Sequence, residues 1–115
     1  MKEKSFAFAL HVVKLSQFLV VDKKEYVLSK QVLRSGAAIG ALISEAEFAQ
    51  SKPDFINKLS VGLKEANETY CWLKLLHEGK YISEPMFNSI QPQTKELIKL
   101  LVISIKTAKK TVKNE

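Results

Sequence analysis

The stretch SKPDFINKLSVGLKEANETYCWLKLLHEG, residues 51–79, decides the fold because it contains both ends of a long helix. Ser51 can cap free amide groups, Pro53 has no amide hydrogen to leave unpaired in the first turn, and Gly79 is typical of a helix end. Small or apolar residues recur between them at helical spacing: Phe55, Leu59, Gly62, Ala66, Thr69, Leu73 and Leu76. The stretch therefore predicts an amphipathic helix from Lys52 to His77.

The same spacing predicts three further helices, at about residues 5–21, 25–49 and 92–112. Because a proline ring clashes with the preceding helical turn, Pro92 predicts a kink or short break at Gln91. No strand-like alternation and no internal repeat occurs, and the connections between helices are short. The sequence therefore predicts one all-α domain over residues 1–115, an antiparallel up-and-down four-helix bundle.

One set of side chains should form the core of this bundle, because helical spacing places it on the inner faces. The set comprises Phe8, Leu15, Val32, Ile39, Ile43, Phe55, Leu59, Leu73, Leu97, Leu101 and Ile105. Gly36, Gly40 and Gly62 stand inside the helices, where glycine costs about 1 kcal/mol relative to alanine. They predict close packing between helices rather than a phosphate-binding loop, which needs a strand before the helix.

The composition is that of a basic globular chain and gives little support for catalysis. The 115 residues carry 18 Lys and Arg against 12 Asp and Glu, a net charge of +6, and 46% are hydrophobic. Glu65 and Glu68 share a helical face, but no Glu is followed by His three residues later, which excludes the usual di-iron site of helical bundles. No nucleotide-binding, zinc-binding or nucleophile motif is present. We therefore expect no enzymatic activity, no cofactor and no metal ion.

Cysteine usage and hydropathy indicate the compartment. Cys71 is the only cysteine, which excludes a disulfide framework and is typical of a reducing environment. The apolar run near the N-terminus is interrupted by His11, Lys14 and Gln17, and no stretch reaches the ~18 uninterrupted apolar residues of a membrane helix. We expect a cytoplasmic protein without a membrane segment.

Two of the expected helices carry a second apolar face, which is unusual in so small a bundle. We interpret these faces as a surface for self-association, with Glu65 and Glu68 either solvated or pairing with Lys64, or with Arg34 across the interface. Scattered apolar residues on a monomer are the alternative interpretation. The expected interface comprises Arg34, Ala37, Ala38, Ala41, Glu45, Phe48, Val61 and Trp72.

Basic charge is concentrated near the C-terminus. Residues 95–115 contain six basic and two acidic groups, and the lysines fall on one side of the last helix. We call this set the lysine ridge: Lys95, Lys99, Lys106, Lys109, Lys110 and Lys113. It is either a solvated outer face or a contact surface for nucleic-acid phosphates.

Two long runs resemble a known bacterial family. They are SKQVLRSGAAIGALISEA, residues 29–46, and AQSKPDFINKLSVGLKEANETYCWLKLL, residues 49–76, and IKTAK at 105–109 adds to them. All three resemble the 23S rRNA intervening-sequence proteins, whose genes were first noticed inside insertions in large-subunit ribosomal RNA genes. The resemblance implies an up-and-down bundle that forms a ring-like homopentamer, with no established enzymatic activity. The related accessory proteins of diversity-generating retroelements are similar pentamers that bind nucleic acid and a reverse transcriptase.

Two classes of function follow from these observations. One is a non-catalytic oligomer that binds RNA or DNA through the lysine ridge, and the other is a scaffold for a protein partner with no nucleic-acid binding. A lysine ridge that stays exposed in the assembly favours the first class. Burial or neutralisation of the ridge by a neighbouring subunit favours the second.

Overall fold

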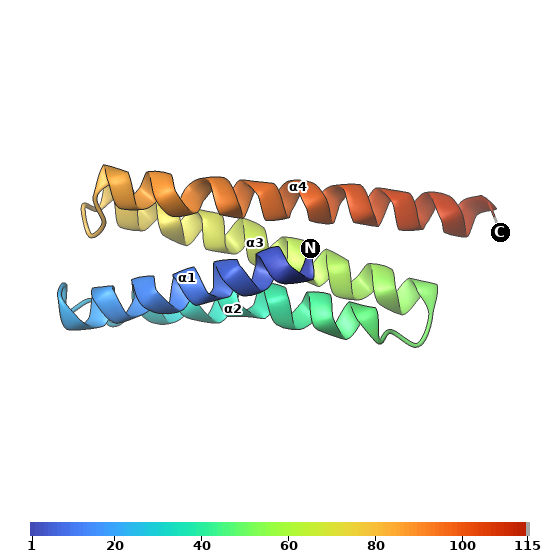
Figure 1. Ribbon diagram of the computed structural model, residues 1–115, viewed down its shortest axis with the longest axis horizontal. Coiled ribbons are helices and arrows are strands. Elements are labelled where there is room, and N and C mark those ends of the chain that lie inside the picture. The colour runs from blue at the N-terminus through green and yellow to red at the C-terminus, as the bar shows by residue number, and fades with distance from the viewer. Residues whose placement is uncertain (115) are drawn as a thin grey trace.

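Four helices make up nearly all of the described chain. The computed structural model describes the backbone of residues 1–114 and the side chains of residues 1–111, and no strand occurs in these residues. The helices are α1 (Lys2–Val21), α2 (Leu28–Glu47), α3 (Lys52–Glu78) and α4 (Glu84–Asn114). Each helix packs on the next, and α1 also touches α4, which gives an elongated all-α bundle of 53 × 21 × 20 Å (Figure 1).

The core runs along the centre of the bundle and agrees closely with the expected set. Of those residues, only Phe55 is incorrectly placed, since it is partly buried against the core rather than within it. Phe55 lies in the first turn of α3, near the end of the bundle, where fewer helices surround it. The expected residues that are buried are Phe8, Leu15, Val32, Ile39, Ile43, Leu59, Leu73, Leu97, Leu101 and Ile105.

The capping prediction for α3 is confirmed. The Ser51 hydroxyl accepts a hydrogen bond from the Asp54 amide at 3.2 Å, and Pro53 lies in the first turn. Asp54 lies in that turn too, where its charge is favourable beside the positive end of the helix dipole.

The start of α2 differs from the sequence prediction, because Glu25 precedes the helix instead of opening it. Its carboxylate accepts hydrogen bonds from the amides of Val27, Leu28 and Ser29, at 3.1, 2.9 and 2.7 Å. The first amides of a helix have no backbone acceptors. Here the carboxylate of the buried Glu25 side chain is their acceptor.

Of the kink or short break predicted at Gln91, the break is wrong, since α4 begins at Glu84 and continues through Pro92. The segment before Pro92 is held by burial: Ile90 is 1% exposed, and the Phe87 ring stacks on His77 with 4.4 Å between centroids. Pro92 and Asn88 both lie on the exposed side of α4. Because Pro92 has no amide hydrogen, the Asn88 carbonyl has no helical donor, and water can take that place. Local strain is therefore outweighed by packing.

Among the described helices, α1 alone is long and apolar enough to cross a membrane by length and composition. This is weak evidence, because core helices of soluble proteins and signal sequences pass the same test. Phe8, Val12 and Leu19 of α1 are fully buried in the bundle core.

Candidate nucleic-acid interface

The lysine ridge lies on the exposed side of α4. Its members up to residue 110 are all exposed, and none forms an ion pair with a described carboxylate. The side chain of Lys113 lies outside the described residues. Glu96, the acidic residue nearest the ridge in sequence, pairs with Lys4 of α1 instead. In Figure 1 the C-terminal end of the α4 backbone projects beyond the other three helices.

An aromatic ring joins α3 to the start of the ridge. The amine of Lys95 lies 5.8 Å from the centre of the Tyr70 ring, and the amine of Lys74 lies 5.7 Å from the same point. Both distances are within the range of cation–π attraction. Lys74 is exposed and Tyr70 is partly buried, so the basic surface extends from α4 onto α3. The sequence analysis missed Tyr70 and Lys74, whose only signal is their four-residue spacing.

Two acidic groups of α3, Glu65 and Glu68, lie on its opposite flank, toward α2. Arg34 of α2 pairs with both Glu65, at 3.1 Å, and Glu68. The Trp72 indole nitrogen also donates to the Glu68 carboxylate, at 3.1 Å. The sequence indicated that Arg34 could meet these acids across an interface between subunits, whereas in the structure both pairs form within one chain. The result is a charge division on α3, with neutralised carboxylates on one flank and Lys74 on the other.

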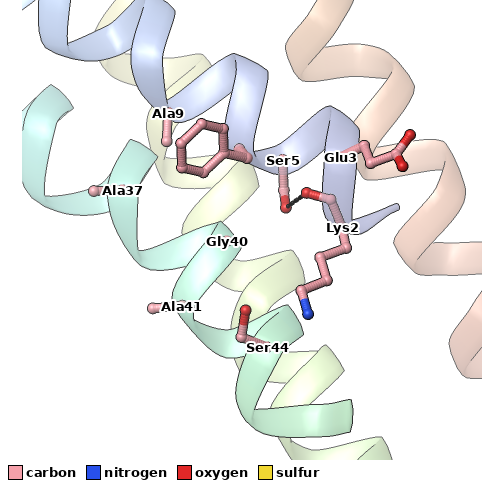
Figure 2. A pocket seen from close by; sticks show the side chains of 9 residues that line it. Lys2, Glu3, Ser5, Ala9, Ala37, Gly40, Ala41 and Ser44 are labelled. Carbon is pink, nitrogen blue, oxygen red and sulfur yellow. Dashed lines mark hydrogen bonds between the residues drawn. The ribbon is translucent and has the colours of Figure 1, made fainter.

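A groove between α1 and α2 contains part of the expected self-association surface. It has a volume of about 660 Å³ and is lined mainly by small and apolar side chains. Figure 2 shows Ser5 and Ala9 of α1 opposite Ala37, Gly40 and Ala41 of α2. We call this feature the α1–α2 groove; its complete lining is Lys2, Glu3, Ser5, Phe6, Ala9, Ala37, Gly40, Ala41 and Ser44.

Apolar side chains on α1 enlarge this surface beyond the groove. Phe6 is 72% exposed, and Leu10, Val13 and Val20 follow it at helical spacing on the same side of α1. The sequence analysis missed them because it treated only one face of this helix as apolar. Their spacing of four, three and seven residues is the sequence pattern that indicates a second apolar face on α1.

The remaining expected interface residues are not all brought together. Phe48, just beyond α2, is 79% exposed, and Glu45 is exposed on the same helix. Ala38 is partly buried. Val61 and the partly buried Trp72 belong to α3 and do not line the α1–α2 groove.

Groups suited to metal or nucleophilic chemistry are dispersed. The part of the chain that the structure describes contains no cluster of three or more His, Cys, Asp or Glu side chains that could hold a metal ion. His11 hydrogen-bonds through Nδ1 to the Gln93 amide oxygen at 2.7 Å, His77 stacks on Phe87, and Cys71 is exposed. These three groups come from separate places in the bundle.

Comparison with known proteins gives a family match over most of the chain. The family model described as 23S rRNA-intervening sequence protein matches residues 1–103. A solved structure from Bacteroides thetaiotaomicron VPI-5482, described as a protein with unknown function from the S23 ribosomal protein family, is 54% identical and superposes with a TM-score of 0.90. That match covers 91% of this chain and 97% of the other. No curated protein matches significantly.

Proposed function

Because the chain belongs to the 23S rRNA-intervening sequence protein family, we propose that it is a non-catalytic oligomer that binds RNA or DNA through the lysine ridge. The observation that carries the proposal is the exposure of the ridge lysines up to residue 110, none of which pairs with a carboxylate among the described side chains. Unpaired amines on one helix face can replace the counterions around phosphates, which is the main source of sequence-independent affinity.

The proposed contact fixes position without reading sequence. Lysine amines bind phosphate oxygens, and those contacts carry no base information. One subunit offers a modest number of amines, so its affinity should be weak. In an oligomer the same face is repeated by symmetry, and simultaneous contacts raise the overall affinity without any new interaction.

Self-association is the second part of the proposal. An exposed apolar groove beside a stripe of exposed apolar residues on α1 is typical of an interaction surface. We propose that another copy of the chain occupies the α1–α2 groove. The ring-like pentamer comes from the family resemblance alone, because an apolar surface does not determine the number of subunits.

We also propose the antiparallel up-and-down arrangement for the bundle and a cytoplasmic location for the protein. Support for the arrangement comes from the short connections between consecutive helices and from the contacts of α1 with both α2 and α4. Support for the location comes from the exposed free thiol of Cys71, which suits a reducing compartment.

Binding of RNA and DNA across a salt series tests the proposed function. Wild-type protein should bind both at low salt, and the logarithm of its affinity should fall linearly with the logarithm of salt concentration. Exchanging Lys99, Lys106 and Lys110 for Glu should abolish binding and leave the oligomer intact.

A matched variant separates the ridge from general basic charge. Exchanging Lys14, Lys52 and Lys64 for Glu changes the net charge equally at exposed lysines of the other helices, and this variant should retain most of the binding. If the two triple variants lose nucleic-acid affinity equally, the lysine ridge is not the binding surface. If wild-type protein binds neither RNA nor DNA at low salt, the protein-scaffold function replaces the proposed one.

A further inference from the structure

Two ammonium groups share one aromatic ring at the junction of α3 and α4. Lys74 and Lys95 each place Nζ within 6 Å of the centre of the Tyr70 ring, at 5.7 and 5.8 Å. Neither lysine forms an ion pair with a described carboxylate. Tyr70 offers each amine the electron-rich surface of its ring, and both amines remain available to an anion.

Ion pairs elsewhere hold three of the acidic side chains that are near this position in sequence. Glu65 and Glu68 belong to the opposite flank of α3, where Arg34 holds them. On the α4 side, Glu96 is held by Lys4 of α1. Glu78 follows Lys74 by one helical turn and is exposed, so the cluster of Tyr70, Lys74 and Lys95 has two amines against one neighbouring carboxylate and keeps a net positive charge.

The position of Tyr70 suits a flat ligand that also carries negative charge. Tyr70 is partly buried, so the bundle holds its ring while part of the residue stays accessible. The amines of Lys74 and Lys95 lie over the ring, and a stacking base would take the place of an amine that moves to the adjacent phosphate. Lys95 begins the lysine ridge, and Lys99 follows one helical turn later. A nucleotide provides both elements, a base with a π-face and a phosphate, and single-stranded binding sites combine aromatic platforms with a basic track in this way.

We propose that Tyr70 stacks on an unpaired base of a single-stranded nucleic acid, while Lys74 and Lys95 bind the phosphates beside that base. The inference rests on the proposed function and deepens it, because it assigns the strand state and a base contact that lysines alone do not supply. Bases within a duplex already stack on each other, so the Tyr70 contact is available only to unpaired ones.

Two probes of equal charge test the inference on the full chain. One is a short oligothymidylate, and the other is an abasic oligonucleotide with the same number of phosphates. Wild-type protein should bind the oligothymidylate about tenfold more tightly, since stacking on an aromatic side chain strengthens binding by at least several-fold per base. The salt dependence should be equal for the two probes, because their phosphate contacts are the same.

Substitutions at Tyr70 then assign the preference to this ring. Tyr70→Leu should remove the preference for bases and leave binding of the abasic probe unchanged, whereas Tyr70→Phe should keep the preference. Tyr26→Leu is the matched control at an exposed tyrosine in the α1–α2 connection, and it should behave as wild type. Melting of each variant by circular dichroism verifies the fold.

The outcomes separate this inference from the function on which it rests. Equal binding of both probes by wild-type protein would overturn the stacking role of Tyr70 while leaving phosphate binding by the lysine ridge in place; this comparison needs no variant to fold. A base preference that survives in Tyr70→Leu would overturn it too. Absence of binding to either probe at low salt would overturn the inference, and the proposed function would fall with it only if RNA and duplex DNA were not bound either.

Discussion

Gly36 of α2 lies so close to Val12 of α1 that a Cβ atom at position 36 would be 2.9 Å from each γ-carbon of Val12. Carbon atoms in favourable contact are about 3.5–4.0 Å apart, so alanine does not fit without movement. Val12 is fully buried in the core, and the close packing of protein interiors leaves such a side chain little room to shift. The glycine therefore sets how closely α1 and α2 approach.

Gly36→Ala should destabilise the protein by about 1–3 kcal/mol, although alanine favours a helix by about 1 kcal/mol over glycine. The control is Gly62→Ala, because the nearest side-chain atom to its added methyl, the Leu42 Cβ, is 3.7 Å away. That variant should be neutral or more stable by up to about 1 kcal/mol. Urea denaturation measures both free energies of unfolding. Equal stabilisation by the two substitutions would show that Val12 does not limit the approach of the helices.

Glu25→Ala should destabilise the protein by about 0.5–2 kcal/mol, because three amides at the start of α2 lose their acceptor. Glu25→Gln keeps one carbonyl oxygen and should cost less. Hydrogen exchange at the amides of Val27, Leu28 and Ser29 should accelerate in both variants, more strongly with alanine. Unchanged exchange at these amides in Glu25→Ala would mean that the carboxylate does not cap the helix in solution.

Features that depend on nearby residues could be predicted from the sequence. The start of α3 follows from Ser51 and Pro53, whose effects act within one helical turn. The same local reasoning gave a wrong break at Pro92. The free-energy cost of a proline within a helix is offset by the burial of Ile90, and that burial depends on the whole bundle. Glu25 was misassigned for a related reason, since a helix-compatible residue can instead turn its side chain back to cap the helix.

The candidate site divides in the same way. The lysine ridge follows from spacing along a single helix, which the sequence contains. The contact of Lys95 with Tyr70 depends on how far α4 is shifted along α3, and no pattern within either helix specifies that shift. The α1–α2 groove likewise requires two helices to be placed side by side. Sequence reasoning found Ala37 and Ala41 on one wall and missed Phe6 and Ala9 on the other.

The pairing of Arg34 with Glu68 should stabilise the subunit only slightly. The Arg34 side chain is half exposed, and exposed ion pairs contribute about 0.2–1 kcal/mol. A double-mutant cycle with Arg34→Ala and Glu68→Ala measures their coupling, which should lie in that range and fall as salt is added. Zero coupling at low salt would indicate that the pair does not persist in solution.

Ala41→Glu should split the oligomer without unfolding the subunit. Ala41 is an exposed residue in the interior of α2, and glutamate is a good helix former, so the isolated subunit accepts the substitution. In the α1–α2 groove, however, the new carboxylate would lie beside apolar side chains that another copy covers in the proposed assembly. Burying a charge without a partner there is strongly unfavourable.

Light scattering and circular dichroism measure the two halves of this prediction. Ala41→Glu should scatter as a monomer at micromolar concentration and keep its helical spectrum, while wild-type protein scatters as an oligomer. The matched control is Ser60→Glu, which adds the same charge at an exposed position of α3 outside the groove, and it should remain oligomeric. A wild-type monomer under these conditions would refute self-association. An oligomer of unchanged mass in Ala41→Glu would instead move the contact away from the α1–α2 groove, because a buried, unpaired carboxylate could not be accommodated there without loss of affinity.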